Sequence, residues 1–332
     1  MAVTSGRITA GSPIGLPGRK DDHMTDAPAP PSARARALVE GAYDTHIHVA
    51  PDVMKRRIDD VDLAHRFADV GLAGFVLKSH YVPTAERAEV VRKVVPGVRA
   101  LGAITLNGSV GGLNPSAVEI AGRQDTRVVW MPTVDSRNQR DSRAQDPPGA
   151  KPPMWAALQD DLRAAGIEPP AVEVVDASGA VTAAVRDVLA VVAKHGMTLA
   201  TGHLNAGEIV AVADAAFEAG VRCVVVTHPE FTSQRLPVDV QRRLADRGAL
   251  LERCFTTPHT GKVSWRQLLD TIRAIGPEHS VLSSDLGQPF NPPVEDGLAL
   301  MADTLLEDGF GEDEIQAMAV TNTRRVAGED RR

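Results

Sequence analysis

The chain alternates short apolar runs with longer segments in which apolar residues recur at helical spacing. The apolar runs cover residues 43–50, 74–81, 98–107, 127–134, 197–204, 222–231, 249–256 and 279–287. Most are nearly continuous in Val, Ile, Leu and Ala, which is typical of parallel strands covered on both faces. The segments between them predict helices over residues 59–70, 84–94, 181–195, 207–219, 237–247, 264–275 and 295–308.

Eight strand–helix units of similar length predict a closed (β/α)8 barrel, the TIM-barrel architecture, because open doubly wound sheets usually have fewer strands. Polar residues near the strand ends recur every 25–30 residues, except after the fourth strand. The longer interval there predicts an insertion. It contains a Pro- and Arg-rich run, a short helix near Trp155, and a small hairpin that turns at Ser178 and Gly179.

Composition indicates one globular domain. Apolar residues make up 43% of the chain and charged residues 24%, and 36 basic against 43 acidic residues give a net charge of −7. No basic block suggests a nucleic-acid partner, and no apolar run reaches the roughly 18 residues of a membrane helix. Cys223 and Cys254 lie inside predicted strands, so no disulfide is implied and a cytoplasmic location is expected. A homo-oligomer is compatible with the sequence but not required by it.

The first 36 residues differ from the rest. They are rich in Gly, Pro, Ser and Ala, without a sustained apolar pattern. We therefore expect residues 1–36 to be a disordered tail and residues 37–332 to form the barrel domain. Met24 lies within this tail, and the sequence does not decide whether translation starts there or at Met1.

The first candidate site residues lie at the end of the first predicted strand, whose sequence is Asp44-Thr45-His46-Ile47-His48. Strand side chains alternate between faces, so both imidazoles point to the same side. Two neutral imidazoles can bind one divalent metal ion. Two histidines on a solvated strand end are the alternative interpretation of this pair alone.

Three further strands end in residues of the same chemistry. His203 ends the fifth strand, His228 the sixth and Asp285 the eighth. All lie at the carboxyl ends of the strands, which share one face of a barrel. Packing explains such a set poorly, because a buried imidazole or carboxylate without a partner costs several kcal/mol. The sequence therefore predicts one metal centre.

This set resembles the amidohydrolase superfamily of metal-dependent hydrolases, whose members carry HxH after strand one, histidines after strands five and six, and an aspartate after strand eight. The resemblance covers residues 43–328, and residues 312–328 look like the helix that closes such barrels. It implies that His46 and His48 hold a first metal and that His203 and His228 complete the centre. Asp285 would ligate the metal and take a proton from the attacking water. Zn²⁺ is the expected ion, with Mn²⁺ or another divalent ion as alternatives, at one or two per chain.

One departure from the superfamily concerns a lysine. Many two-metal members carry a carbamylated lysine at the end of strand four, where this chain has only apolar residues, Pro and Thr. Instead, strand two ends with Lys78 and His80, which point the same way as each other. Lys78 could bridge two metals as a carbamate, meet an anionic substrate as a cation, or be an exposed loop lysine. His80 is a candidate substrate contact.

Weaker substrate candidates follow strands six and seven. Glu230, Glu252, Arg253 and His259 lie where loops of a barrel reach substrate, although charged residues near loops are usually solvated. No glycine-rich phosphate-binding motif follows the first strand, so nothing suggests a nucleotide cofactor.

We expect a metal-activated water to cleave an amide, lactone or ester bond of a small molecule. A metal-dependent decarboxylase or other lyase is the first alternative, because it uses a similar ligand set. A catalytically inactive binding barrel is the second, although all five predicted ligand positions are filled. The identity of the substrate depends on loops and does not follow from the sequence.

Overall fold

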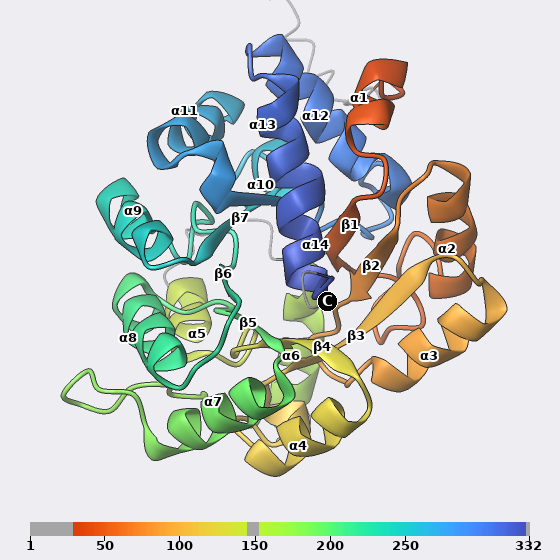
Figure 1. Ribbon diagram of the computed structural model, residues 1–332. Helices are drawn as coiled ribbons and strands as arrows, with labels where there is room; N and C mark the ends of the chain where they lie inside the picture. Colours follow the sequence, from red (N-terminus) through yellow and green to blue (C-terminus); the bar gives the residue numbers. More distant parts are fainter. Residues whose placement is uncertain (1–28, 145–152, 330–332) are drawn as a thin grey trace, which may run out of the picture.

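The computed structural model describes residues 29–144 and 153–329 and contains an eight-stranded parallel sheet in chain order (Figure 1). The strands are β1 (Tyr43–Ile47), β2 (Gly74–Leu77), β3 (Arg99–Thr105), β4 (Thr126–Trp130), β5 (Thr198–Ala200), β6 (Val224–Val226), β7 (Leu250–Cys254) and β8 (Ser280–Ser283). The end of β8 returns to β1 through a parallel bridge between Ile47 and Leu286. The predicted (β/α)8 barrel is confirmed.

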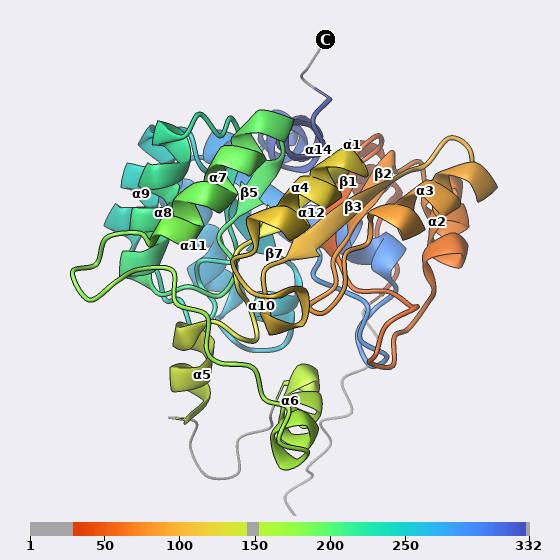
Figure 2. The same ribbon diagram turned by 90° about the horizontal axis from the view of Figure 1, so that it is seen from below.

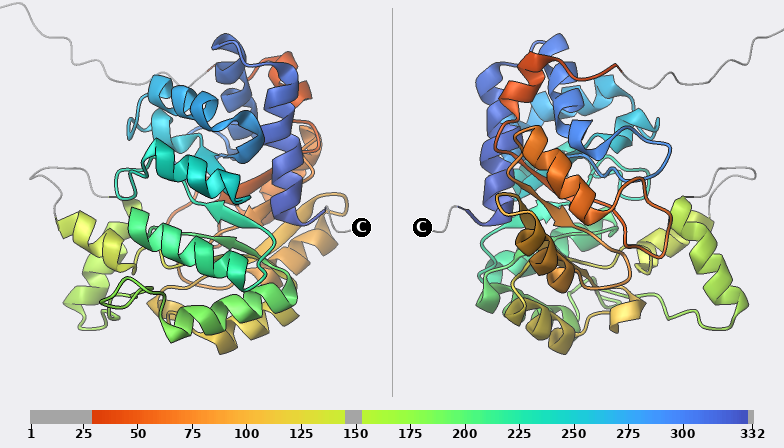
Figure 3. Two further views of the ribbon diagram at one scale, coloured as in Figure 1. Left: turned by 60° about the vertical axis from the view of Figure 1, so that its left-hand side comes forward. Right: turned by 90° about the vertical axis from the view of Figure 1, so that its right-hand side faces the viewer.

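Helices surround the strands on the outside, as the side views show (Figure 3). The helices that follow the predicted pattern are α2 (Asp60–Asp69), α3 (Ala85–Val94), α7 (Ala183–His195), α8 (Ala206–Glu218), α9 (Val238–Asp246), α11 (Trp265–Ile275) and α12 (Gly297–Glu307). Their apolar stripes face the strands. In α11, for example, Leu268 and Ile272 are fully buried, and the side chain of Ser264 accepts a hydrogen bond from Gln267 N to cap the first turn.

The pattern missed α4 (Pro115–Arg123), which completes the unit between β3 and β4. A helix-start signal was present in the sequence, because Asn114 precedes Pro115. The Asn114 side chain caps the helix by accepting from Ser116 N and Ala117 N, and proline suits the first helical position.

The barrel domain begins earlier than predicted. Residues 1–28 lie outside the described residues, but α1 (Ala33–Leu38) falls partly within the expected disordered tail. Ala35 is fully buried. Ser32 donates a hydrogen bond to Asp303, and Arg36 forms an ion pair with Asp296. The boundary at residue 36 is therefore wrong, because α1 docks on α12 through these contacts.

The insertion after β4 is confirmed. It comprises α5 (Arg137–Ala144), α6 (Met154–Ala164) and a hairpin in which Val175 bridges Val181. Figure 2 shows α5 and α6 extending from one end of the barrel, opposite to α14 (Asn322–Ala327). Residues 145–152 of the insertion lie outside the described residues.

The end opposite the insertion is closed by the last helix. Its segments are α13 (Glu312–Gln316), a π-helical turn over Ala317–Thr321, and α14. Val326 and Ala327 are buried in the same cluster as Trp130 of the barrel interior. A closing helix over residues 312–328, as the resemblance implied, is thus present. Among the described residues, no helix combines the length and apolar character needed to cross a bilayer.

Most strands end several residues before the predicted boundaries. β6, for example, ends at Val226 rather than near residue 231, and β2 ends at Leu77. The apolar runs extend further because the chain stays buried after it leaves the strand ladder. Lys78, His203, His228 and Asp285 accordingly lie on the turns that follow the strands.

Candidate metal centre

The two histidines of the first strand are joined to the eighth strand by backbone hydrogen bonds. Asp285 N donates to His46 O (2.8 Å) and His48 N donates to Leu286 O (2.8 Å). The carboxylate of Asp44 accepts from Ser284 N at 3.0 Å and reinforces this junction. These contacts set Asp285 beside the two imidazoles.

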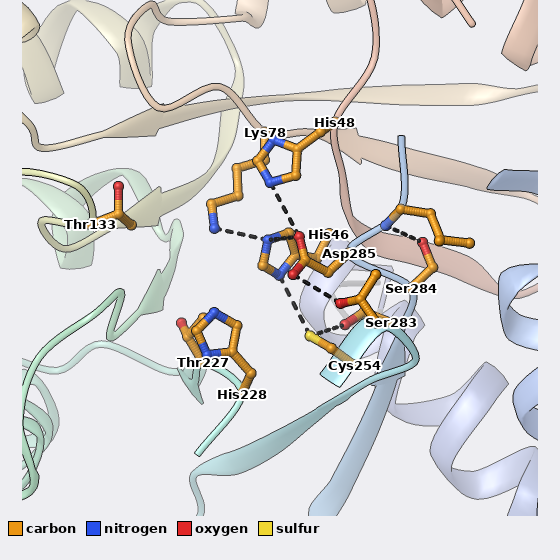
Figure 4. Close-up of polar contacts among 12 residues, drawn as sticks. His46, His48, Lys78, Thr133, Thr227, His228, Cys254, Ser283, Ser284 and Asp285 are labelled. Carbon is orange, nitrogen blue, oxygen red and sulfur yellow. Dashed lines mark hydrogen bonds and ion pairs between the residues drawn. The ribbon is translucent and has the colours of Figure 1, made fainter. Parts of the chain in front are cut away.

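His46, His48 and Asp285 converge on one point (Figure 4). Oδ1 of Asp285 lies 3.2 Å from Nε2 of His46 and 3.3 Å from Nε2 of His48. The other carboxylate oxygen accepts a hydrogen bond from the Thr256 hydroxyl at 3.1 Å. The expected proximity of these three residues is therefore present in the structure.

A buried carboxylate fixes the tautomer of His46. Oε1 of Glu252 lies 3.1 Å from Nδ1 of His46, and a carboxylate can only accept, so Nδ1 carries the proton. The lone pair of Nε2 then points toward Asp285. Glu252 also accepts from His228 N (3.2 Å) and from the Ser283 hydroxyl (3.0 Å). These bonds make Glu252 a residue that positions histidines, not the substrate contact that we expected.

Lys78 enters the same centre from β2. Its side chain is buried, with Nζ 2.8 Å from Nε2 of His46 and 5.2 Å from the centre of the Trp130 ring. The interpretation of Lys78 as an exposed loop lysine is wrong. An amine that donates to Nε2 agrees with the tautomer that Glu252 imposes.

The donor set fits a divalent cation. Two imidazole lone pairs and a carboxylate oxygen face one another within 4.8 Å. Three hydrogen-bond acceptors so close together repel one another unless a positive charge lies between or beside them. Two imidazole nitrogens with one carboxylate oxygen are a common set of ligands for zinc. The hydrogen bond from His46 Nδ1 to Glu252 is of the kind that orients metal-ligating histidines in proteins.

A second group of potential ligands, His46, Glu252 and Cys254, lies on the other side of the same imidazole. It is the weaker candidate. Nδ1 of His46 is engaged by Glu252, and burial raises the pKa of the Cys254 thiol well above its ordinary value. A protonated thiol is a poor ligand.

Three more histidine rings surround this centre without joining the convergent group. The ring of His228 lies 6.0 Å from that of His46 and 5.1 Å from that of His203, between centroids. The ring of His80 stacks on His48 at 5.0 Å. The structure thus gathers all the histidines predicted for the site, but His203 and His228 lie outside the set of three.

Burial keeps these rings neutral. Desolvation lowers the pKa of His48 to about 3 and that of His228 to about 4, and it holds the pKa values of His80 and His203 well below the usual range. Neutral imidazoles are the form that binds metals. Within the part of the chain that the structure describes, Nδ1 of His48 and Nδ1 of His203 are buried without a hydrogen-bond partner.

Asp285 is ionised in this setting. Burial alone would raise its pKa, but His46, His48 and Lys78 hold the pKa of this carboxyl well below its ordinary value. An ionised carboxylate at neutral pH can both ligate a cation and accept a proton.

Two of the candidate residues adopt backbone conformations that are uncommon outside glycine. Asp285 has φ of 53° and His228 has φ of 23°. Gly202, directly before His203, has φ of 64°, and a Cβ atom there would lie 2.3 Å from Met131 O. Strained turns of this kind cluster at functional sites, where the surrounding structure holds them in place.

Three expected substrate contacts, Glu230, Arg253 and His259, make other interactions. Arg253 is buried between strands, where it pairs with Glu230 and donates to Gln241 at 2.9 Å. It alternates with Glu252 and therefore faces away from the centre. His259 stacks on Phe255 at 4.9 Å. Arg253 is corrected to an ion-pair role, and the substrate contacts expected of Glu230 and His259 stay predictions.

Sequence reasoning missed the polar residues that hold the rings. The Thr133 hydroxyl lies 2.9 Å from Nδ1 of His80, and Asn107 donates to the same hydroxyl at 2.7 Å. Gln234 lies 3.3 Å from Nδ1 of His228. No local motif marks these residues. The position of Asn107 and Thr133 just beyond β3 and β4 is the one signal that could have identified them.

Comparison with solved structures finds the same fold in proteins of low sequence identity. An amidohydrolase from Pseudomonas aeruginosa aligns with a TM-score of 0.54, at 12% identity over 89% of this chain and 97% of that chain. The probable dipeptidase PvdM from the same organism aligns at 0.55, with 12% identity and the same coverage. YjjV, a TatD homologue from Escherichia coli K12, aligns at 0.52, with 14% identity over 87% and 98% of the two chains. At such identities the likeness concerns the fold.

The amino-acid sequence assigns the chain to one protein family. Residues 41–252 match the family of unknown function DUF6282, and the chain belongs to this family. A search of curated proteins found no significant match.

Proposed function

We propose that this protein is a metal-dependent hydrolase that cleaves an amide, lactone or ester bond of a small molecule. The observation that carries the proposal is the convergence of His46 Nε2, His48 Nε2 and Asp285 Oδ1, with the His46 tautomer set by Glu252. The amidohydrolase fold of the solved structures supports it.

His46, His48 and Asp285 would hold the first metal ion, for which Zn²⁺ is our preferred identity. His203, His228 and Lys78 line the adjacent space and are the candidates for a second ion. A divalent metal bound here would lower the pKa of a water molecule and polarise the bond under attack.

The protein's own groups supply the proton transfer. Asp285 is ionised and exposes its side chain more than the histidines do, at 19% against 0% for His46 and 4% for His48. Its carboxylate can accept the proton of an attacking water, and the hydrogen bond from Thr256 holds it in orientation. Lys78, as a cation, can meet negative charge on the substrate, and as a carbamate it can serve as a ligand.

The test combines metal analysis with product analysis. Purified protein should contain a divalent metal by mass spectrometry, and removal of the metal should abolish turnover of amides, esters or lactones in a substrate panel. Hydrolysis in H₂¹⁸O should place the label in the product acid. Release of CO₂ without label incorporation would indicate a lyase instead. Full activity of metal-free protein would contradict the proposal.

A further inference from the structure

A groove opens between the loop after β6, the start of α9, and α11 together with the segment that joins α10 (Thr256–His259) to it. Its volume is about 470 Å³. The polar residues that line it include Thr232, Arg235, Gln241, Lys262 and Gln267. The two loops follow the carboxyl ends of β6 and β7, so the groove starts at the rim of the barrel that carries the centre, and from there it is lined by α9 and α11.

The charge of this groove is positive. Arg235 and Lys262 are exposed, and neither forms an ion pair with any residue that the structure describes. Glu230 is the acidic residue in the lining, but its carboxylate is buried and paired with Arg253. Two cations therefore face the groove without a compensating carboxylate.

Phe231 links the groove to the metal centre. Its ring lies 5.0 Å from the ring of His228 and 6.4 Å from that of His203, between centroids. On the other side, Nζ of Lys262 lies 5.9 Å from the centre of the same ring. Phe231 therefore contacts both a histidine of the centre and a cation of the groove, which brings the two sites close to each other.

The backbone holds Arg235 in an unusual conformation. Its φ is 41°, in the region that favours glycine, and its amide donates to Phe231 O at 2.9 Å. The next amide, Leu236 N, donates to Pro229 O at 2.9 Å and closes the turn. An arginine in this conformation costs on the order of 1–3 kcal/mol of strain. The turn thus holds a cationic residue in a backbone conformation that favours glycine.

We propose that the groove is a specificity subsite that binds a carboxylate of the substrate through Arg235 and Lys262. The inference rests on the proposed hydrolase function for the identity of the reacting bond, and it adds the substrate class: an amide or ester that carries a second, anionic end. Arginine suits a carboxylate because its planar guanidinium offers paired donors. Gln241, Gln267 and Thr232 add neutral hydrogen-bonding groups around it.

The first test measures binding without turnover. Glutarate is titrated calorimetrically into wild-type protein and into an Arg235→Asn/Lys262→Met double variant. Asparagine tolerates positive φ, and methionine keeps an apolar stem over Phe231. We expect the double variant to bind glutarate roughly 10–100-fold more weakly, as expected for loss of charge-assisted hydrogen bonds. The uncharged glutaramide should bind weakly to both proteins.

Two controls make this test specific. Arg222→Asn removes an exposed arginine before β6, at the opposite end of the same strand, and should leave glutarate binding unchanged. Glu218→Gln, on the exposed end of α8, should also retain glutarate binding. Equal affinity of glutarate for wild type and double variant would overturn the subsite. Inorganic phosphate that binds more tightly than glutarate would overturn the assignment to a carboxylate.

The second test uses turnover. N-acetylglutamate and N-acetylglutamine differ only in the distal charge. The double variant should raise KM for the first about tenfold or more, with little change in kcat, and leave KM for the second unchanged. If glutarate binding depends on the two cations but no bond is hydrolysed, the subsite stands and the proposed hydrolase function fails. Hydrolysis with unchanged KM for N-acetylglutamate would leave the hydrolase and remove the subsite.

Discussion

The amine nitrogen of Lys78 lies 2.8 Å from Nε2 of His46, the atom that also faces the carboxylate of Asp285. A lysine in this position competes with a metal ion as long as it is an ammonium, and it becomes a ligand once it is carbamylated. Burial lowers the pKa of Lys78, which favours the neutral amine that reacts with CO₂. We therefore expect the chemical state of this one side chain to decide how many metal ions the proposed centre holds.

Substitution of Lys78 by methionine should lower the metal content from two ions per chain to one. A carbamate would bridge two ions about 3.5–4 Å apart, and methionine cannot replace its oxygens. The measurement is metal stoichiometry of wild type and variant, each with and without bicarbonate. One ion per chain in both proteins, with an increase in KM as the sole effect, would instead identify Lys78 as a cation that binds substrate.

Glu252→Gln should weaken metal binding by about 10–100-fold while the barrel stays folded, because Glu252 orients His46. Competition with a chelator measures the affinity, and circular dichroism reports the fold. Glu218→Gln, on the exposed end of α8, is the matched control. A Glu252→Gln protein with wild-type metal affinity would show that the hydrogen bond to His46 does not support the centre.

Asp285→Asn should lose more activity than metal. An amide oxygen still coordinates weakly, but it cannot accept a proton, so kcat should fall by about 10²–10⁴-fold. His203→Ala and His228→Ala, by contrast, should lower bound metal and activity together. Near-normal turnover of Asp285→Asn would exclude its role as the base.

A cluster of charged residues around Glu119 should make the free energy of unfolding depend on pH in the acidic range. Hydrogen bonds from His195, Lys194 and Arg123 lower the pKa of Glu119 to about 2, against an ordinary value of 4.5. A carboxyl with a depressed pKa stabilises the fold above its unfolded-state pKa, and this contribution is lost as the pH falls from 4.5 toward 2. Wild type should therefore melt above Glu119→Gln at pH 6, and the two melting temperatures should approach each other below pH 4. A difference independent of pH would contradict this.

Arg36→Ala should destabilise the protein by about 1–2 kcal/mol, because its guanidinium pairs with Asp296 and donates to Glu295 O at 3.0 Å in a partly buried setting. Arg34 lies in the same helix as Arg36 and forms an exposed ion pair with Glu312 of α13. Arg34→Ala should therefore cost less than about 0.5 kcal/mol. Chemical denaturation of both variants compares them. Equal, negligible effects would mean that α1 adds nothing to the fold.

Period-two alternation explains both the successes and one error of the sequence interpretation. It correctly placed His46 and His48 on one side of β1. The same rule, applied to β7, puts Glu252 inside and Arg253 outside, whereas the sequence interpretation treats both as substrate contacts. The pairing of Arg253 with Glu230 joins β7 to the loop after β6, and such a contact has no signature in either segment alone.

The turns after the strands were beyond prediction. Positive φ at His228, Asp285 and Arg235 depends on tertiary contacts, because only a small share of residues other than glycine adopt it and the sequence does not show which ones do. The groove beside Phe231 arises where two loops from different units meet. The start of the domain was misplaced because α1 is short and weakly apolar, and its stability comes from contacts with residues near 300.

The junction of β1 and β8 joins residues about 240 positions apart, at the point where Asp285 N bonds to His46 O. During synthesis, the imidazoles of His46 and His48 leave the ribosome long before their carboxylate partner exists. A nascent chain therefore has no complete set of acceptors with which to capture an ion. Metal binding at the proposed centre would therefore be a late event, coupled to closure of the barrel, and the bound ion would link the first strand to the last.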